Sequence, residues 1–290
     1  MDVRFWAATD VGRTRDHNED NFLVDKKLNL FIVADGMGGH AAGEVASSLA
    51  VREVRRHLAE NRAVVEAFAE KPTNAGREKV LELIESSIEE ACGRVHQAAQ
   101  EDQSRQGMGT TLSMLLLVGP RGFVGHVGDS RIYLCRGDGV HQITEDHSLL
   151  NELIKKGKLK PGDAFDSPYK NAVTRAVGVY ETVEVDAFDI DVVPEDYFLL
   201  CSDGLSCYID EDITRRYLTG FTVKEAPERF IHLANECGGK DNITAVVVQL
   251  VEKDAEASEA RTSHVHRRQA AVQGQAVFRY LDYRELVMVM

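Results

Sequence analysis

The chain has 290 residues, of which 43% are hydrophobic and 28% are charged, and its net charge is −13. This length holds one large domain or a domain with an appendage, and the composition is that of an ordinary globular protein. The acidic charge argues against a general nucleic-acid binder. It fits a protein that gathers carboxylates around cations, although solubility alone explains it equally well.

The sequence carries no sign of export or of a membrane anchor. No apolar run approaches the roughly 20 residues that a membrane-spanning helix needs, and the start, Met1 to Trp6, lacks the apolar core of a signal peptide. The five cysteines are odd in number and form no close pair of the zinc-ligand type. These features predict a cytoplasmic protein with reduced thiols that binds neither membrane nor nucleic acid.

The first part of the chain reads as strands followed by two long helices. Strands are expected at 3–10, 21–25 and 30–34. Apolar residues then recur at helical spacing over 42–60 and 77–100. Between these helices, Lys71 to Gly76 reads as a turn because it contains proline and glycine.

From residue 110 onward, short glycine-rich joins predict a meander of antiparallel strands. Further strands are expected at 110–118, 122–127, 131–136, 140–143, 183–188, 197–201 and 243–251, and further helices at 146–156, 209–218 and 223–236. The polar segment 158–170 contains two prolines and reads as a mobile flap. Strands at both ends with helices inserted in pairs predict a layered protein whose sheets are largely antiparallel.

The composition changes after Val251, so we expect a catalytic domain over 1–251 and a linker over 252–276. The chain turns apolar again over 277–290, where we expect a terminal helical segment. The stretch from Phe278 to Leu286 resembles the helical lead-in to cyclic-nucleotide-binding domains. The segment could therefore be the start of a truncated regulatory domain, or equally an amphipathic terminal helix or a partner-docking segment.

Four aspartates stand beside glycine or at the end of an apolar run: Asp35, Asp129, Asp203 and Asp241. The apolar runs before Asp35, Asp129 and Asp203 resemble buried strands, so the aspartate side chains at the ends of these strands can converge on one point. Glycine beside them lets carbonyls and ligands approach closely. Converging carboxylates repel one another unless a cation lies between them, and hard oxygen ligands favour Mg²⁺ or Mn²⁺. Although a single Asp-Gly pair is most often a turn, the set predicts a metal site with more than one ion.

Seven short motifs carry a closer resemblance. They lie at 12–21, 34–40, 107–112, 125–131, 144–148, 202–205 and 241–244. In this order they resemble the type-2C, metal-dependent serine/threonine protein phosphatases (the PPM family), most closely the bacterial branch. The resemblance covers about residues 3–250. It implies an α+β fold, a four-layer α-β-β-α sandwich of two antiparallel sheets flanked by helix pairs.

The resemblance also implies a set of ligands for two to three Mn²⁺ or Mg²⁺ ions. Asp35 would bridge two ions, and the Gly36 carbonyl would complete the shell of one. Asp203 and Asp241 would bind the other ion. Asp129, together with Asp203, would hold a third, weaker ion. The alternative for Asp129 is a turn residue that bonds a neighbouring backbone amide.

Three further residues are expected at this site. Glu19 and Asp20 match the acidic pair that reaches the metals partly through water, and we expect Asp20 nearer the ions and Glu19 outside them. For both, the alternative is a solvated loop. Arg15 is the expected phosphate clamp, because a guanidinium matches two phosphoryl oxygens and stays charged. The alternative is a surface arginine paired with Asp16 or Glu19.

The general acid is left open by the sequence. Eukaryotic members place a histidine directly after the Asp-Gly pair, but this chain has Met37 there, which cannot donate a proton. His40 could serve instead, or it could cap the helix that begins near Ala42, and a metal-bound water is a third option. We expect His126 and His147 to be structural, bonded to backbone or carboxylate groups.

These expectations describe a signalling enzyme, a protein-serine/threonine phosphatase. It would hydrolyse phosphoserine and phosphothreonine in proteins by a water or hydroxide that bridges two divalent metals. Its partners would be phosphoproteins and a bacterial-type kinase that it opposes. Two alternatives are a non-catalytic pseudophosphatase and a two-metal hydrolase of another phosphoester. The complete set of metal aspartates speaks against the first, and an aromatic content of only 7% with strong acidity speaks against the second.

Overall fold

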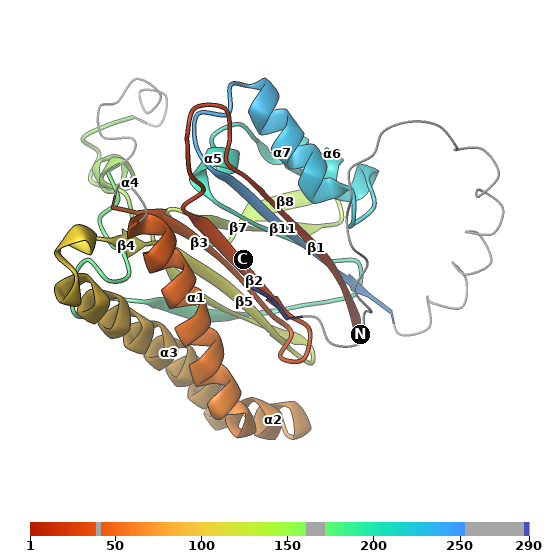
Figure 1. Ribbon diagram of the computed structural model, residues 1–290. Coiled ribbons are helices and arrows are strands. Elements are labelled where there is room, and N and C mark those ends of the chain that lie inside the picture. Colours follow the sequence, from red (N-terminus) through yellow and green to blue (C-terminus); the bar gives the residue numbers. More distant parts are fainter. Residues whose placement is uncertain (39–41, 161–171, 253–286, 290) are drawn as a thin grey trace.

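The computed structural model describes residues 1–38, 42–160, 172–252 and 287–289. Two antiparallel sheets pack face to face, and helices cover the outer face of each (Figure 1). The described residues therefore form the four-layer α+β sandwich that the sequence predicts. Among these residues, no helix combines the length and the apolar character that crossing a membrane requires.

The first sheet joins the beginning of the chain to the end of the predicted catalytic domain. Its strands, in order across the sheet, are β1 (Asp2–Asp10), β11 (Ile243–Val251), β10 (Tyr197–Cys201), β7 (Arg131–Arg136) and β8 (Gly139–Gln142). Strand β1 pairs with β11 along its whole length, from Asp2 opposite Val251 to Asp10 opposite Ile243. The two ends of the domain are therefore neighbours in the fold.

The second sheet is built from the middle of the chain and one terminal segment. Its strands, in order, are β12 (Val287–Val289), β2 (Asp20–Asp25), β3 (Leu30–Met37), β5 (Leu112–Val118), β6 (Arg121–Val127) and β9 (Asp186–Asp191). A two-residue strand, β4 (Gly109–Thr110), pairs with the end of β3. All of these pairings are antiparallel.

Helices lie on both outer faces (Figure 1). The second sheet is covered by α1 (Ala42–Glu60), α2 (Arg62–Glu70) and α3 (Asn74–Glu101), and the first by α5 (Asp203–Ser206), α6 (Glu211–Gly220) and α7 (Ala226–Glu236). A 3₁₀ turn (Gln103–Arg105) follows α3, and α4 (Leu149–Lys155) follows β8.

Strand β3 shows why the central strands read as continuous apolar runs. Leu30 and Ile32 pack on the helix side of the sheet, whereas Phe31 and Val33 pack against the first sheet. Successive side chains of a strand point to opposite faces. Because both faces of this strand are covered, every one of these positions has to be apolar.

The structure differs from the sequence prediction at α2, which the sequence did not reveal. This helix buries only Phe68, and Asn61 at its start makes no side-chain capping bond. Its apolar face, with Val64 and Val65 beside Phe68, is short, and no capping bond marks its start, so the sequence gives no clear start signal for it. The strand expected at 183–188 is also displaced, since β9 spans Asp186–Asp191.

The terminal segment gives a second correction. Val287–Val289 form strand β12, which pairs with Leu23 to Asp25 of β2, so the predicted helix is wrong for these three residues. The open edge of β2 supplies backbone hydrogen-bond partners, and valine suits a strand. The rest of the terminal segment, the linker over 253–276 and most of the flap, 161–171, lie outside the described residues.

Candidate active site

Five aspartates from distant parts of the sequence gather at one rim of the sandwich. Asp20 begins β2 and lies opposite Asp35, near the end of β3. Asp129 follows β6, Asp203 follows β10, and Asp241 precedes β11. Antiparallel pairing brings the ends of some strands and the beginnings of others to the same rim. The structure therefore brings together the five aspartates that the sequence singled out as ligands.

Asp20 ties the two sheets together at this rim. Its Oδ2 atom accepts hydrogen bonds from Ser202 Oγ at 2.7 Å and from Thr244 Oγ1 at 2.6 Å. Thr244 lies in β11, and Ser202 directly follows β10 of the same sheet. Its Oδ1 atom is buried and accepts no hydrogen bond from any described residue. Asp20 is only 6% exposed. One oxygen is therefore fixed by hydroxyl donors, and the other stays free for a cation.

The backbone of Asp35 is held by two threonines. The Asp35 N–H donates to Thr111 Oγ1 at 2.9 Å, and Thr110 Oγ1 donates to the Asp35 carbonyl at 2.9 Å. The Thr111 N–H also donates to that carbonyl at 2.9 Å. The two threonines therefore fix the position of the residue that is expected to bridge two ions.

Glycine is required beside two of the aspartates by close approach of the backbone. A Cβ atom on Gly36 would lie 2.2 Å from the Gly43 carbonyl oxygen, and one on Gly204 would lie 2.0 Å from the Asn242 carbonyl oxygen. Side chains cannot be accommodated at such distances. The Asp-Gly pairs are therefore packing requirements that bring α1 against β3, and α5 against the start of β11.

The carboxylates hold one another's pKa values high. Removal from water raises the pKa of Asp20 to about 7, and the neighbouring Asp203 and Asp241 add to the effect. The same cause raises the pKa of Asp129 to about 7, with Asp203 as the main charged neighbour. The pKa values of Asp35 and Asp203 are raised as well, again by removal from water and then by nearby aspartates. This is the electrostatic pattern of a site that lacks positive charge.

Arg15 is a cation that makes a direct contact with this cluster, and Arg131 lies near Asp129 and Asp203. Its Nη2 atom lies 2.7 Å from Asp241 Oδ2, and the two side chains are 49% and 29% exposed. The bond to Asp241 raises the pKa of Arg15. The partner is thus neither Asp16 nor Glu19, but an expected metal ligand. From this position the guanidinium lies beside the carboxylates, where a phosphoryl group would need a clamp.

Glu19 lies next to the cluster and faces the start of α1. Its Oε1 atom accepts a hydrogen bond from the Gly43 N–H at 3.2 Å, and its carbonyl accepts one from the Gly36 N–H at 3.1 Å. Removal from water raises the pKa of its carboxyl. Glu19 therefore joins α1 to β3 at the edge of the cluster.

Asn242 is a site residue to which the sequence assigned no role. Its side chain accepts from the Glu19 N–H at 2.8 Å and donates to the carbonyls of Val11 and His17. It fastens the loop that carries Arg15 to the start of β11. Its place beside Asp241 in a motif was the available signal, but a structural contact of this kind leaves no chemical signature. His40 lies outside the described residues.

The cluster suits divalent cations, although its side chains do not already surround one cation position. Asp20 Oδ1 and Asp203 Oδ1 are buried oxygens without a hydrogen-bond donor among the described residues. Within that same part of the chain, no three carboxylate, imidazole or thiol groups already surround one point. Orphaned oxygens with raised pKa values are what hard cations such as Mn²⁺ and Mg²⁺ would satisfy. The donor set fits the metals that the resemblance implies.

The fold and its rim of carboxylates are those of a metal-dependent hydrolase, and comparison with known proteins gives the family. Residues 12–247 match the family model described as Protein phosphatase 2C, and the chain belongs to this family. It is thus an enzyme of the protein phosphatase class. The chain is 40% identical over 256 residues to the serine/threonine phosphatase stp of Listeria innocua, covering 86% of this chain and 98% of that protein.

Solved structures agree with this assignment. The serine/threonine phosphatase PstP of Mycobacterium tuberculosis is 32% identical with a TM-score of 0.76, and the match covers 86% of this chain and 99% of that one. A structure of the PstP catalytic domain in complex with two manganese ions is 32% identical with a TM-score of 0.73, over 86% of this chain and 99% of that one. This chain is therefore similar to bacterial phosphatases of known fold.

Proposed function

We propose that this enzyme hydrolyses phosphoserine and phosphothreonine in proteins with two or three Mn²⁺ or Mg²⁺ ions. Asp35, the Gly36 carbonyl, Asp203 and Asp241 would hold the first two ions. Asp129 would hold the third ion with Asp203, and Asp20 would reach the ions partly through water. When bound, the ions would supply an activated water nucleophile and offset charge on the phosphoryl oxygens.

One observation carries this proposal. Asp20, Asp35, Asp129 and Asp203 lie close enough to raise one another's pKa values, and two of their oxygens are buried without a donor. Isolated buried carboxylates are costly unless a cation or a donor satisfies them. Such a cluster is disfavoured for fold stability alone, and bound divalent ions would compensate it.

The residues of this chain have two further tasks. Arg15 would turn from Asp241 toward the phosphoryl group once cations neutralise that carboxylate, and would hold two of its oxygens. The leaving oxygen needs a proton, for which we propose His40, with a water molecule as the alternative. A pH–rate profile of His40→Ala that keeps both limbs would remove His40 from this role.

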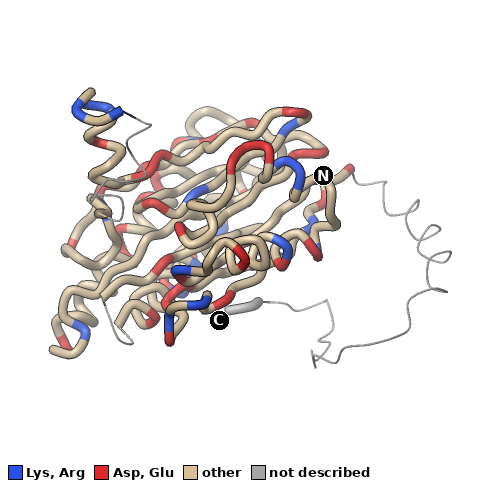
Figure 2. Tube along the Cα trace, turned by 90° about the horizontal axis from the view of Figure 1, so that it is seen from above, with Lys and Arg blue, Asp and Glu red and all other residues tan. Residues whose placement is uncertain are grey.

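The physiological setting is also proposed from chemistry. A protein phosphatase of bacterial type would oppose a serine/threonine kinase on shared phosphoproteins. The acidic segments are spread over the trace in Figure 2, with basic segments scattered between them. This arrangement suits protein substrates better than a nucleic acid. All five cysteines are free, in keeping with the cytoplasmic location that we propose.

The test is hydrolysis of a phosphothreonine peptide with Mn²⁺, with Mg²⁺ and with a chelator, by wild type and Asp203→Asn. Asp212→Asn is the matched control, because it makes the same change on a side chain that is 93% exposed. We expect metal-dependent activity in wild type and Asp212→Asn, and at least about a hundredfold loss in Asp203→Asn. A folded wild type that is inactive with every metal would favour a phosphoprotein-binding role instead.

A further inference from the structure

The backbone and the ring of His147 both form hydrogen bonds with Gly128, the residue that precedes Asp129. It lies in the loop between β8 and α4, and it is 8% exposed. Its backbone N–H donates to the Gly128 carbonyl at 2.8 Å. Its ring atom Nδ1 lies 3.1 Å from the Gly128 backbone nitrogen. A single residue thus satisfies both hydrogen-bonding groups of Gly128, directly before an expected metal ligand.

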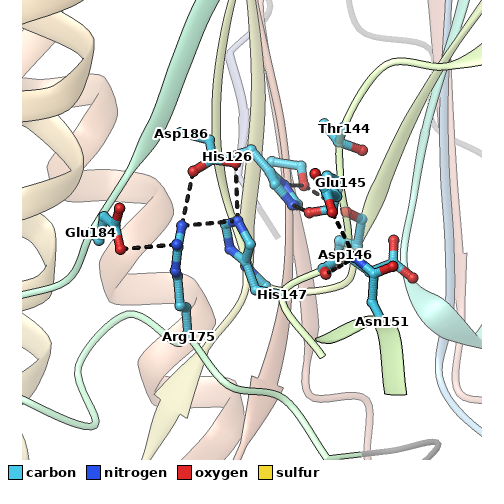
Figure 3. Close-up of polar contacts among 12 residues, drawn as sticks. His126, Thr144, Glu145, Asp146, His147, Asn151, Arg175, Glu184 and Asp186 are labelled. Carbon is cyan, nitrogen blue, oxygen red and sulfur yellow. Dashed lines mark hydrogen bonds and ion pairs between the residues drawn. The ribbon is translucent and has the colours of Figure 1, made fainter. Parts of the chain in front are cut away.

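The contact with Gly128 decides the tautomer of His147. A backbone N–H can only donate, so Nδ1 must accept and the ring proton must be on Nε2. Nε2 lies 3.1 Å from Asp186 Oδ2, which accepts that proton (Figure 3). Arg175 Nη1 donates to the other oxygen, Asp186 Oδ1, at 2.9 Å, and it also lies 3.2 Å from His147 Nε2. With the ring proton on Nε2, this last contact is an approach of two donors that share the Asp186 carboxylate. The Asp186 carboxylate therefore favours the ring tautomer that carries its proton on Nε2 and leaves the Nδ1 lone pair to Gly128.

The position of Gly128 leaves no room for a side chain. Its φ angle is +110°, a region that favours glycine, and a Cβ atom there would lie 2.6 Å from the Thr111 side chain. Thr111 Oγ1 in turn bonds the Asp35 N–H and Ser130 Oγ. The Gly128 peptide is therefore packed directly against the residue that orients Asp35. A small rotation of this peptide would redirect the Asp129 carboxylate.

We propose that His147 is a positioning residue, which holds the Gly128 peptide so that Asp129 faces the cation it binds. Asp186 acts through His147 by fixing its tautomer. This inference rests on the proposed function, because it takes Asp129 to be a cation ligand. Groups that orient a ligand from outside, without touching the metal, commonly contribute to metal affinity.

Two substitutions separate the two functions of the ring. In His147→Asn the amide oxygen reaches where Nδ1 lies, so it can still accept from Gly128 but no longer reaches Asp186. In His147→Gln the longer side chain can still donate to Asp186, but it offers Gly128 no acceptor. If positioning of Gly128 is what matters, the asparagine variant keeps the function and the glutamine variant loses it.

The first experiment is a Mn²⁺ titration of metal-free protein, followed by the electron paramagnetic resonance signal of free Mn²⁺. Asp129→Asn defines which binding step depends on Asp129. We expect His147→Gln to weaken that same step by about tenfold or more, and to leave the tighter steps within twofold. His147→Asn should stay within threefold of wild type at every step. This readout does not depend on phosphatase activity.

The outcomes separate this inference from the proposed function. A wild type that binds no Mn²⁺ would overturn both. A wild type that binds Mn²⁺ normally, with unchanged steps in His147→Gln, would overturn only the role of His147. Unchanged steps in Asp129→Asn would overturn that role together with the proposed role of Asp129 as a ligand. Equal weakening of all steps in both His147 variants, in parallel with their melting temperatures, would show a merely structural histidine and would also overturn it.

A second variant covers a glutamine variant that does not fold, and it adds hydrogen exchange of the metal-free protein to the Mn²⁺ titration. Asp186→Asn, at a residue whose side chain is 37% exposed, lets an amide donate to Nε2 and frees the ring to place its proton on Nδ1, against the Gly128 N–H. We expect faster hydrogen exchange at the Gly128 amide and a weaker Asp129-dependent Mn²⁺ step. Unchanged exchange together with unchanged Mn²⁺ binding would contradict the inference.

Discussion

Asp20 shows how single residues make this rim reactive toward cations. Its carboxylate is removed from water and faces other aspartates, yet it is given donors on one oxygen only. The donors Ser202 and Thr244 lower its pKa, and burial, which is the larger effect, raises it. The result is a carboxylate with a pKa of about 7, for which a proton and a metal ion would compete near neutral pH.

Arg15 gives the first prediction at this scale. Arg15→Ala should raise KM for a phosphothreonine peptide by about tenfold or more, because a charge-assisted contact to the phosphoryl group is lost. Mn²⁺ affinity should stay within twofold or become tighter, because Arg15 competes with cations for Asp241. Steady-state kinetics and a Mn²⁺ titration measure the two effects. Equal KM values for both proteins would show that Arg15 does not bind the phosphate.

His126 gives a prediction on pH. Burial, and then the neighbouring His147, lower the pKa of His126 to about 4, so the ring stays neutral when folded. The unfolded chain binds a proton near pH 6.5, and stability from this group is therefore present above that pH and lost as pH falls toward 4. The loss amounts to about 3 kcal/mol at most.

The measurement for His126 is the free energy of unfolding in urea at pH 7 and at pH 4.5, for wild type and His126→Gln. The aspartates titrate in both proteins, so the difference between the two pH dependences isolates the histidine. The glutamine variant should lose less stability between these pH values than wild type. Parallel losses would mean that His126 is charged in the folded protein.

At the scale of elements, the sequence predicted what strong patterns encode. The strands β1, β2, β3, β5, β6, β7, β10 and β11 and the helices α1, α3, α6 and α7 carry apolar runs or stripes, and the structure has them close to the expected bounds. Strand β12 depends on a tertiary contact, the open edge of β2, which local sequence does not contain. Helix α2 has a short apolar face but no capping bond at its start, so its local signal was weak.

The candidate site divides in the same way. Acidic residues beside glycine can be recognised in the sequence as candidate ligands, and all five expected aspartates lie at one rim. The residues that hold them, such as Thr111, Ser202 and Asn242, lie within the same motifs, but the sequence did not reveal what they do there. Hydroxyl and amide groups serve equally well in caps and turns, so their type alone does not reveal which backbone they fix.

Gly204 supports a prediction about the contact between α5 and β11. Gly204→Ala should lower kcat/KM by about a hundredfold and cost about 1–3 kcal/mol of stability, because the new methyl group would press against the Asn242 carbonyl and part Asp203 from Asp241. Gly93→Ala is the matched control, since the nearest heavy atom would be 3.9 Å away and alanine favours the helix. Kinetics and urea unfolding check both variants. Normal activity in Gly204→Ala would show that this contact does not set the aspartate spacing.

At the scale of the whole molecule, cations would act as cross-links between the two sheets. Ligands expected from β3, α5 and the start of β11 share ions, so binding should stabilise the folded state over the unfolded chain. At one hundred times the dissociation constant each ion contributes about 2.7 kcal/mol. We expect Mn²⁺ to raise the melting temperature by about 5–10 °C.

Thermal unfolding with Mn²⁺ and with a chelator measures this effect. Asp203→Asn should lose most of the increase, whereas Asp212→Asn should keep it. An equal increase in all three proteins would indicate that Mn²⁺ binds away from the rim. The comparison needs no substrate, so it also tests the metal site in a variant without activity.

The pairing of β1 with β11 has a consequence for how the protein folds during its synthesis. Strand β1 is synthesised before the other described strands, and within the described part of the chain it pairs only with β11, which is synthesised long after it. Contacts between residues so distant in sequence form slowly, because a long loop has to close before they can be made. The second sheet and its helices can assemble during synthesis. The first sheet has to wait for Val251 to emerge, and until then β1, with Val3, Phe5 and Ala7, is an unpaired strand that a chaperone could bind.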